Sequence, residues 1–249
     1  MLSSEQRFNA PIPAQVAFWN WWNAKYREYG KLDQVQLEQA DVVQQWLEHL
    51  GRKNLHIIEV GCGSGWMCER LVRYGDVTGT DLSHEVLERA AKRSSSPKFV
   101  PGDFMALNFE KGSYDVVVTL EVLPHVASQP AFVGKLASLL RPRGYLMLAT
   151  QNRPVLERND IPPPMAGQIR HWVDRHELAR LLDTRFEIEQ LFSITPQFNR
   201  GLLRIVNSRQ VKAVLSGLGL SAARAWIKSA QEQAWLGWTL VCLAQKKAT

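Results

Sequence analysis

The chain has 249 residues, of which 45% are hydrophobic and 22% charged, and its net charge is +6. This composition is typical of a globular protein with a sizeable core; no apolar run approaches the ~18 residues of a membrane span, and the first residues lack the apolar region of a secretory signal. Three cysteines (Cys62, Cys68 and Cys242) are too few for a disulfide framework, so we expect a protein of the reducing cytoplasm.

Two helices are predicted before the first strand, and they make up an N-terminal part at residues 1–52. The first covers residues 13–30, and the second covers residues 33–51 and ends at a glycine. Four aromatic residues fall on one stripe of the first helix: Phe18, Trp22, Tyr26 and Tyr29. This stripe predicts an amphipathic helix that packs on the rest of the protein.

Short apolar runs alternate with helical patterns in residues 53–150. Strands are expected at 55–60, 76–80, 98–103, 114–122 and 144–150, and helices at 66–75, 83–93 and 130–140. Strands that alternate with helices form βαβ units, in which helices cover both faces of a parallel sheet. The predicted fold class is therefore α/β, with residues 53–150 as its core.

Residues 151–249 are expected to complete the sheet and to form a substrate cap within one overall domain. The proline-rich segment 151–167 is longer than a compact α/β unit needs, which is typical of a lid. A helix, a strand, a partly helical insertion and a last strand are expected at 174–184, 186–192, 193–229 and 235–247. Because open α/β sheets bind ligands at the carboxyl ends of their strands, we expect the two insertions to form a small cap there.

The positive charge is concentrated in the C-terminal part. Residues 1–150 carry 16 Lys and Arg against 16 Asp and Glu, whereas residues 151–249 carry 14 against 8. No acidic residue lies between Glu189 and Glu232, a stretch that contains six basic residues. Such a surface attracts anions, among them an anionic substrate, a lipid headgroup or nucleic acid, and an ordinary solvated face explains it equally well.

A glycine turn directly follows the first predicted strand. Gly61, Gly63 and Gly65 allow positive φ angles and a close approach of the backbone to a ligand. The dinucleotide fingerprint requires a third glycine where Trp66 stands, which argues against a pyrophosphate site. Asp81, at the end of the second predicted strand, is placed to accept hydrogen bonds from two ribose hydroxyls. The sequence thus predicts an adenosine site.

Five segments taken together give the strongest indication of family: EVGCGSG, GTDLS, PGDF, YDVVVTLEVLPHV and LLRPRGYLMLATQN. In this order they resemble the class I S-adenosylmethionine-dependent methyltransferases, and within them the small-molecule branch, which includes quinone-biosynthesis and sugar or natural-product enzymes. The resemblance covers residues 55–152 well. It implies a Rossmann-like, mostly parallel seven-stranded sheet with the last strand antiparallel and with S-adenosylmethionine as the cofactor.

The resemblance also implies roles for individual residues. The N-terminal helices would cover the cofactor site, with Trp22 and Tyr26 near its methionine part. Residues Glu59, Gly61, Cys62, Gly63 and Gly65 would line the methionine end. Asp81 would hold the ribose, and the adenine would lie among Leu82, Gly102, Asp103 and Phe104. Leu120 and Glu121 would contact the methionine part.

Methylation of a hydroxyl group also requires a base, and histidine has the most suitable pKa for this role. His125 follows the fourth predicted strand and is the first candidate, although it fits a loop-capping role equally well. His171 and His176 follow the proline-rich loop and are further candidates. A metal site is not expected, because Glu121 is the only carboxylate in the segment after that strand.

The methyl group is expected to go to an oxygen, nitrogen or carbon atom of a small molecule such as a metabolite, sugar or natural product, and the basic C-terminal part favours an anionic one. Two alternatives remain: a methyltransferase that acts on RNA or protein through this basic region, and a non-catalytic methyltransferase-like subunit that binds a partner. The intact glycine turn, Asp81 and Asp103 argue against the non-catalytic alternative. Oligomeric state cannot be read from the sequence.

Overall fold

A computed structural model describes residues 10–208, 210–211, 217 and 219–248 of the chain. The strands are β1 (Leu55–Val60), β2 (Gly75–Asp81), β3 (Lys98–Pro101), β4 (Tyr114–Leu120), β5 (Leu140–Gln151), β6 (Phe186–Ile194) and β7 (Thr239–Lys246). The α-helices are α1 (Ile12–Tyr26), α2 (Gln34–Leu50), α3 (Cys68–Leu71), α4 (His84–Arg93), α5 (Gln129–Leu139), α6 (Arg153–Leu156), α7 (Arg175–Asp183), α8 (Gly201–Val206) and α10 (Ser221–Gln233). Two 3-10 helices, η2 (Val72–Tyr74) and η3 (Leu123–His125), complete the elements used below.

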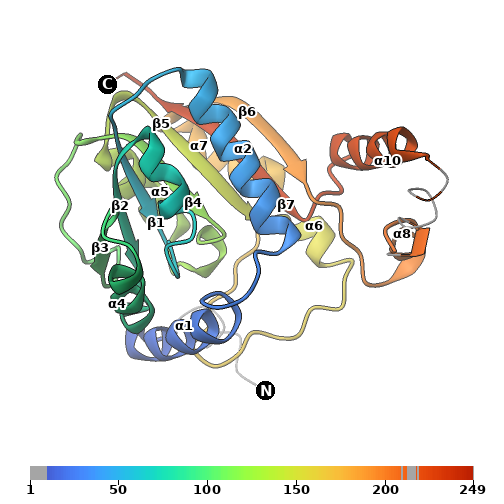
Figure 1. The fold of residues 1–249 in the computed structure, drawn as a ribbon, viewed down its shortest axis with the longest axis horizontal. Helices are drawn as coiled ribbons and strands as arrows, with labels where there is room; N and C mark the ends of the chain where they lie inside the picture. The colour runs from blue at the N-terminus through green and yellow to red at the C-terminus, as the bar shows by residue number, and fades with distance from the viewer. Residues whose placement is uncertain (1–9, 209, 212–216, 218, 249) are drawn as a thin grey trace.

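The strands form one seven-stranded sheet in the order β3-β2-β1-β4-β5-β7-β6. All neighbours pair in parallel except β7, which is antiparallel to both β5 and β6. The predicted fold class is therefore confirmed (Figure 1). The chain order reverses between β1 and β4, and the carboxyl ends of parallel strands diverge at such a switch point, where open α/β sheets bind ligands.

Two apolar clusters bury the two faces of the sheet. Side chains of α2, α3 and α4 pack with Ile57 and Val118 on one face, and side chains of α5 and α7 pack with Ile58 and Val117 on the other. Neighbouring residues of one strand thus belong to opposite clusters, because side chains alternate across a strand. Burial on both faces explains why these strands are continuous apolar runs in the sequence.

The second N-terminal helix has clear start and stop signals. Asp33 caps α2 by accepting from the Gln36 N–H, and the Gln36 side chain accepts from the Asp33 N–H in return. Gly51 ends the helix with a left-handed conformation, φ 62°. Of the expected aromatic stripe, Phe18 is buried and Trp22 half-buried, whereas Tyr26 and Tyr29 are exposed, and the other buried positions of α1 are Gln15, Asn20 and Asn23. The polar side of α1 therefore faces the protein interior.

The two late insertions differ in their relation to the sheet. The proline-rich segment contains α6 and runs along one side of the molecule, whereas α8 and α10 project beyond the β6 side of the sheet (Figure 1). None of the helices in the described part of the chain is both long enough and apolar enough to cross a membrane.

Candidate active site

A cavity of about 590 Å³ lies at the switch point, where β1, β2 and β4 end. Its size is in the range of small-molecule sites. Its walls come from α1, α2, the loops after four strands and a few C-terminal residues. The charged and aromatic residues that line it are Trp19, Trp22, Arg27, Asp33, Trp66, Asp81, Asp103, Phe104, Glu121, His125, Phe132 and Trp238.

Asp81 holds the glycine turn against the end of β2. Its Oδ2 accepts from the Gly63 N–H at 2.8 Å, and its Oδ1 accepts from the Ser83 N–H at 2.7 Å. A carboxylate oxygen can accept more than one hydrogen bond, so both oxygens keep acceptor capacity on the cavity side. Asp81 therefore both shapes the turn and presents an acceptor to a ligand.

Asp103 lies in the same cavity, at the loop after β3. The Gly102 N–H donates to the Asp81 carbonyl at 3.0 Å, which ties the two loops together. One oxygen of Asp103 accepts from the Met105 N–H at 2.9 Å. Leu82 and Phe104 line the cavity beside the two carboxylates. Two carboxylates with apolar residues around them match the needs of an adenosine, which has donor groups on its ribose and its base and a flat apolar ring.

A side chain is excluded at two glycines of the turn by different neighbouring residues. At Gly61 (φ 78°), a Cβ atom would lie 2.0 Å from a methyl carbon of Val122. The close approach of the loops after β1 and β4 therefore requires glycine at this position. At Gly65 (φ 78°), a Cβ atom would lie 2.7 Å from the ring of Phe99. Gly61, Cys62 and Gly63 line the cavity, whereas Gly65 does not. The structure thus gives Gly65 a packing role in place of the expected ligand contact.

Glu121 is a buried carboxylate on the cavity wall, directly after β4. It has a positive φ of 62°, which is uncommon outside glycine and is found preferentially at functional sites. Its Oε1 accepts from Gln39 Nε2 at 2.6 Å and from Thr239 Oγ1 at 3.0 Å. Its Oε2 is buried and has no hydrogen-bond partner among the described residues. Burial raises the pKa of Glu121 to about 7.

His125 lines the cavity at the end of η3, and its ring orientation is fixed. The Nδ1 atom lies 2.7 Å from the carbonyl oxygen of Ile169. Because a carbonyl can only accept, we assign the ring proton to Nδ1, which leaves Nε2 as an acceptor. Burial lowers the pKa of His125 to about 4, so the ring is neutral at neutral pH.

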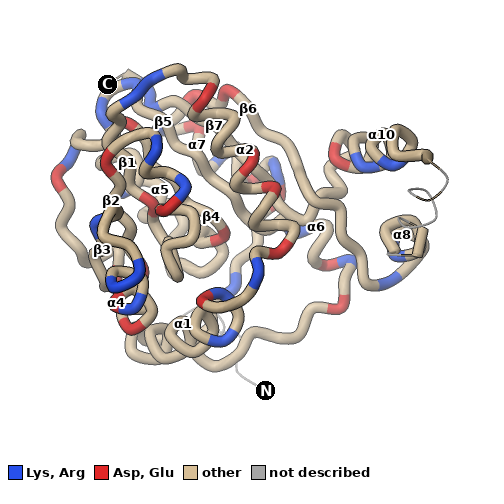
Figure 2. The backbone as a smooth tube through the Cα atoms, viewed as in Figure 1, with Lys and Arg blue, Asp and Glu red and all other residues tan. Residues whose placement is uncertain are grey.

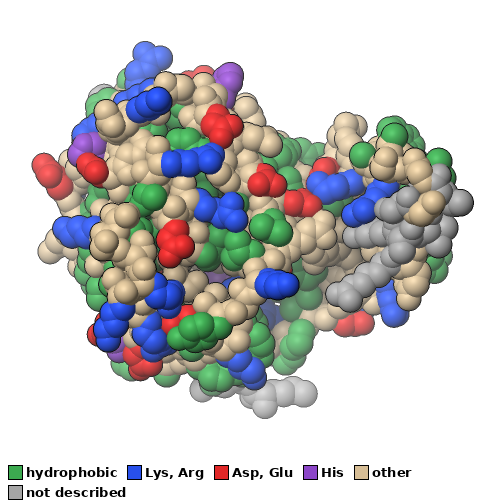
Figure 3. All heavy atoms as spheres, viewed as in Figure 1, with side chains coloured by type: hydrophobic (Ala, Val, Ile, Leu, Met, Phe, Trp, Pro, Cys, Tyr) green, Lys and Arg blue, Asp and Glu red, His purple; other side chains and the backbone are tan. Residues whose placement is uncertain are grey.

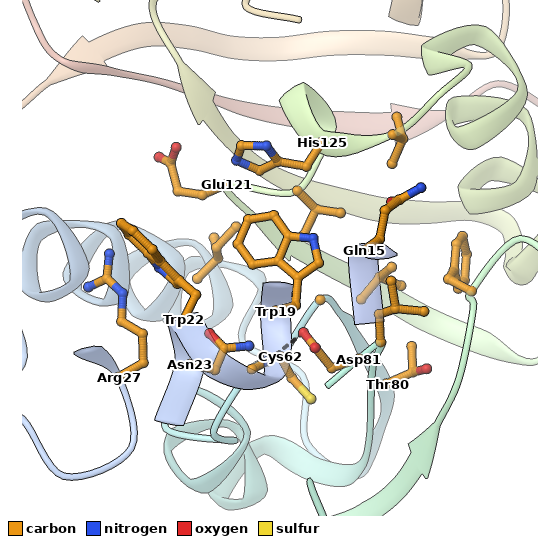
Figure 4. Close-up of a pocket in the computed structure, with 18 of the residues that line it drawn as sticks. Gln15, Trp19, Trp22, Asn23, Arg27, Cys62, Thr80, Asp81, Glu121 and His125 are labelled. Carbon is orange, nitrogen blue, oxygen red and sulfur yellow. Dashed lines mark hydrogen bonds between the residues drawn. The ribbon is translucent and has the colours of Figure 1, made fainter. Parts of the chain in front are cut away.

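Helix α1 covers the cavity and is anchored to the loops below it. Asn23 Nδ2 donates to Ser83 Oγ at 2.6 Å, and Ser64 Oγ donates to the Arg27 carbonyl at 3.2 Å. In Figure 4 the indole of Trp19 lies between Asp81 on one side and Glu121 and His125 on the other. The Trp19 ring contacts the His125 ring edge-on, with centroids 4.8 Å apart. Covering by α1 shields the cavity from bulk water.

The cavity has one permanently charged cation. Among the described residues Arg27 is the only Lys or Arg that lines it, and its Nη1 lies 2.7 Å from Asp33 Oδ2. The lining carboxylates are Asp33, Asp81, Asp103 and Glu121. The described lining of the cavity is therefore acidic, although the whole chain has a net positive charge.

Four more expected site residues lie outside the cavity. Tyr26 is 47% exposed and packs on Trp22, with ring centroids 4.6 Å apart. Glu59 is buried behind the glycine turn, where its Oε2 accepts from the Cys68 thiol at 2.9 Å. His171 contributes its backbone N–H to the Pro124 carbonyl, and His176 is an exposed residue in the first turn of α7. Tyr26 and Glu59 were expected from the resemblance and the two histidines from their place in the sequence, whereas the backbone directs these side chains away from the cavity.

The buried Glu59 leads to a prediction about stability. Burial raises its pKa from 4.5 to about 8. A carboxyl whose pKa is raised by folding stabilises the protein most below its unfolded pKa, and this contribution is lost as pH rises through the folded pKa. In the parent protein we therefore expect the free energy of unfolding to fall by roughly 3–5 kcal/mol between about pH 5 and pH 8. In Glu59→Gln this fall should be absent.

Urea unfolding at several pH values measures this effect. The exposed Glu69→Gln, on α3, is the matched control and should keep the pH dependence of the parent. An equal slope in Glu59→Gln and the parent protein would show that Glu59 is ionised in the folded state.

Several lining residues were not predicted from the sequence. Gln36 and Gln39 are buried on the inner face of α2 and reach the cavity, as do Asn23 from α1 and Arg27 directly after it. The available signal was a pair of glutamines spaced by three on the face of α2 that also carries Val43 and Trp46. A buried polar side chain on an apolar helix face indicates a specific partner, here Glu121 for Gln39.

The C-terminal third contributes little to the cavity. It contributes Gln151, Gln168, Gln197 and Trp238 to the lining, and no described residue of α8 or α10. The larger part of the insertion expected to cap the site lies beside it. Within the described residues, no group of three or more His, Cys, Asp or Glu is placed to hold a metal ion.

Comparisons of sequence and of structure with known proteins both find methyltransferases. Residues 58–148 match the model of a family described as "Methyltransferase domain". A relative named ubiquinone biosynthesis O-methyltransferase, from Sinorhizobium medicae, is 31% identical over 180 residues, which cover 65% of this chain and 71% of the relative. A relative with the same name from Mesorhizobium japonicum has the same identity and coverage. An S-adenosylmethionine-dependent methyltransferase from Mesorhizobium loti has a similar structure, with a TM-score of 0.58 at 18% identity, covering 83% of this chain and 99% of that one.

Proposed function

The chain belongs to the S-adenosylmethionine-dependent methyltransferases, and we propose that it transfers the methyl group to a hydroxyl oxygen of a small, largely uncharged aromatic molecule. That it is an enzyme of methyl transfer to a small molecule follows from its relatives. The acceptor atom and the kind of acceptor are the proposed part. The observation that carries them is the buried Oε2 of Glu121, which lacks a partner among the described residues and belongs to a residue that lines the same cavity as Asp81 and Asp103.

The residues at the adenosine end fit the cofactor. The free acceptor capacity of Asp81 suits two ribose hydroxyls, and Asp103 can accept from the adenine amino group. Arg27 offers a guanidinium to the carboxylate of the methionine part. S-adenosylmethionine supplies an electrophilic methyl group on a sulfonium. The protein then has to align the acceptor, exclude water and remove a proton.

The lining of the cavity determines which acceptor is favoured. Among the described residues, the lining has four carboxylates and one guanidinium, itself paired with Asp33, and this balance disfavours a strongly anionic molecule. The basic residues that favoured an anionic acceptor in the sequence lie in an insertion beside the cavity. Aromatic side chains on several sides, Trp19, Phe104 and Phe132 among them, favour a flat ring. We therefore replace the expected anionic acceptor with an uncharged aromatic one.

Two groups in the cavity can take the proton of a hydroxyl. His125 presents Nε2, and its pKa of about 4 makes it a weak base. Glu121 presents Oε2, and its pKa of about 7 is close to the value at which a general base is most efficient at neutral pH. We assign proton removal to Glu121, and hydrogen-bond acceptance from the acceptor to His125. The names of the relatives, which specify O-methylation in ubiquinone biosynthesis, support oxygen as the acceptor atom.

A product assay tests this proposal. The protein is incubated with S-adenosylmethionine and a panel of phenols and catechols, and S-adenosylhomocysteine and the methylated product are detected by mass spectrometry. We expect methyl ethers from the hydroxyl compounds and no product from the matched compounds whose hydroxyl is already a methoxy group. Transfer to nitrogen or carbon instead, or transfer only to RNA or protein, would refute the proposal.

A further inference from the structure

The projecting insertion between β6 and β7 has a composition that the methyl-transfer site does not explain. We call the described residues of 200–230 the arm; it contains α8 and most of α10. No residue of α8 is buried, and the only buried residue of α10 is Gln231, just beyond the arm. In Figure 1 both helices stand apart from the sheet. The arm therefore adds little to the core, and its surface needs another explanation.

Large apolar side chains on the arm are exposed to solvent. Leu202 is 82% exposed, Trp226 72% and Ile205 60%. On α10 the exposed Ala222, Ala225 and Trp226 share one stripe at helical spacing. Exposed apolar residues that gather in one projecting element indicate an interaction surface. Figure 3 shows hydrophobic side chains on this lobe of the molecule.

The same element is basic. The sequence from 190 to 231 has six basic residues and no acidic one. Arg200 pairs with Asp160 at 2.9 Å, and Lys228 pairs with Glu232 at 2.6 Å, so these two are neutralised where the arm joins the body. Arg204 is exposed and forms no ion pair with any residue of the described chain. Arg224 is the other basic residue of α10, whose basic positions are blue in Figure 2.

We propose that the arm docks on the surface of an anionic lipid bilayer. A basic element with exposed Leu, Ile and Trp side chains combines attraction to anionic headgroups with insertion of apolar side chains between them. A second copy of the chain fits less well, because a symmetric contact would place the basic arms against each other. Nucleic acid would satisfy the basic residues and leave Leu202 and Trp226 without apolar contacts.

The segments that connect the arm to the sheet line the cavity, so docking of the arm would place the cavity near the membrane surface. The insertion that carries the arm leaves the sheet after Ile194 and returns before Thr239, at the edge of the sheet that carries the cavity. Gln197 and Trp238, on either side of the arm, both line the cavity. Docking would hold this edge of the sheet near the headgroups. If the proposed function is correct, an acceptor with a lipid tail could then enter from the membrane surface.

Vesicle flotation tests the docking without using enzyme activity. The full-length protein is mixed with vesicles of phosphatidylglycerol and phosphatidylcholine, or of phosphatidylcholine alone, and the floating fraction is measured. We expect binding to the anionic vesicles that weakens with salt, and at least about 10-fold weaker binding to the neutral ones. The variant Leu202→Ser/Ile205→Ser/Trp226→Ser should lose roughly 10-fold or more in binding to anionic vesicles.

Matched controls exclude a general effect of the substitutions. Tyr29→Ser removes another exposed apolar side chain, 79% exposed, and should float like the parent protein. All variants should keep the parent's melting temperature and its affinity for S-adenosylmethionine, because the altered residues are exposed and lie outside the cavity. The charge variant Arg204→Glu should weaken binding to anionic vesicles only.

Four results would overturn the docking. They are absence of flotation with anionic vesicles, equal binding to neutral vesicles, undiminished binding of the triple variant, and a concentration-dependent dimer that the triple variant abolishes while no protein floats. The last result would assign the arm to a second copy of the chain. Failure of the product assay would leave the flotation result unchanged, so the two proposals fail separately.

Discussion

Replacing Asp81 by alanine is expected to raise the Kd for S-adenosylmethionine by roughly 10²–10³-fold, because hydrogen bonds to a charged acceptor contribute about 1.5–3 kcal/mol each. The variant also leaves the Gly63 and Ser83 N–H groups without their acceptor, so the glycine turn loses its support. Isothermal titration measures the affinity. Thermal melts with and without cofactor give an independent value, since a ligand that binds only the folded state raises its stability.

Two further variants separate the contribution of Asp81 to the turn from its contact with the cofactor. Asp81→Asn keeps one oxygen that can accept from the Gly63 or the Ser83 N–H but lacks the second acceptor and the charge, so we expect a loss of affinity of about 10-fold. Asp76→Ala removes an exposed carboxylate near the other end of β2 and should bind the cofactor like the parent. Unchanged affinity in Asp81→Ala would be incompatible with the proposed adenosine site.

The grouping of the residues that we assign to the adenosine could be predicted from the sequence because it depends on the order of the strands. Parallel strands that alternate with helices bring their carboxyl ends to one edge, so residues that follow β1, β2 and β3 must meet there. Asp81 ends β2, Gly63 and Asp103 follow β1 and β3, and the structure brings the three together in one cavity. No knowledge of side-chain packing was needed for this step.

The residues that the sequence misplaced depend on side-chain direction. Glu59 is the penultimate residue of β1, and its side chain points behind the glycine turn toward Cys68. Gly65 serves the packing of Phe99, which comes from β3 and is distant in sequence. A motif gives the position of the backbone, whereas the direction of a side chain depends on partners that the motif does not contain.

The position of the C-terminal insertion also could not be predicted from local pattern. Its charge and its exposed apolar residues are visible in the sequence, and both are compatible with a cap or with a separate surface. The structure distinguishes them, because Gln197 lines the cavity whereas α8 and α10 do not. The charge of the whole chain was therefore a poor guide to the charge of the cavity: the cavity is acidic and the arm is basic.

The last prediction concerns Glu121, whose replacement by glutamine is expected to lower kcat/KM for the acceptor by roughly 10²–10⁴-fold, the usual contribution of a general base. Glutamine keeps one oxygen for Gln39 and Thr239 and places an NH₂ group where Oε2 was. The size of the side chain and the support of the loop are thus retained, and the ability to take a proton is lost.

The pH dependence of kcat/KM distinguishes the two candidate bases. With Glu121 as the base, activity should rise as the carboxyl loses its proton near its pKa of about 7 and should then level off. With His125 as the base, activity should already be level above its pKa of about 4. The Glu121→Gln variant should lose the rise, whereas His125→Asn, whose amide can still donate to the Ile169 carbonyl, should keep it at a lower rate. A parent profile that is flat across neutral pH, or a Glu121→Gln variant that loses only cofactor affinity, would show that Glu121 binds and does not remove the proton.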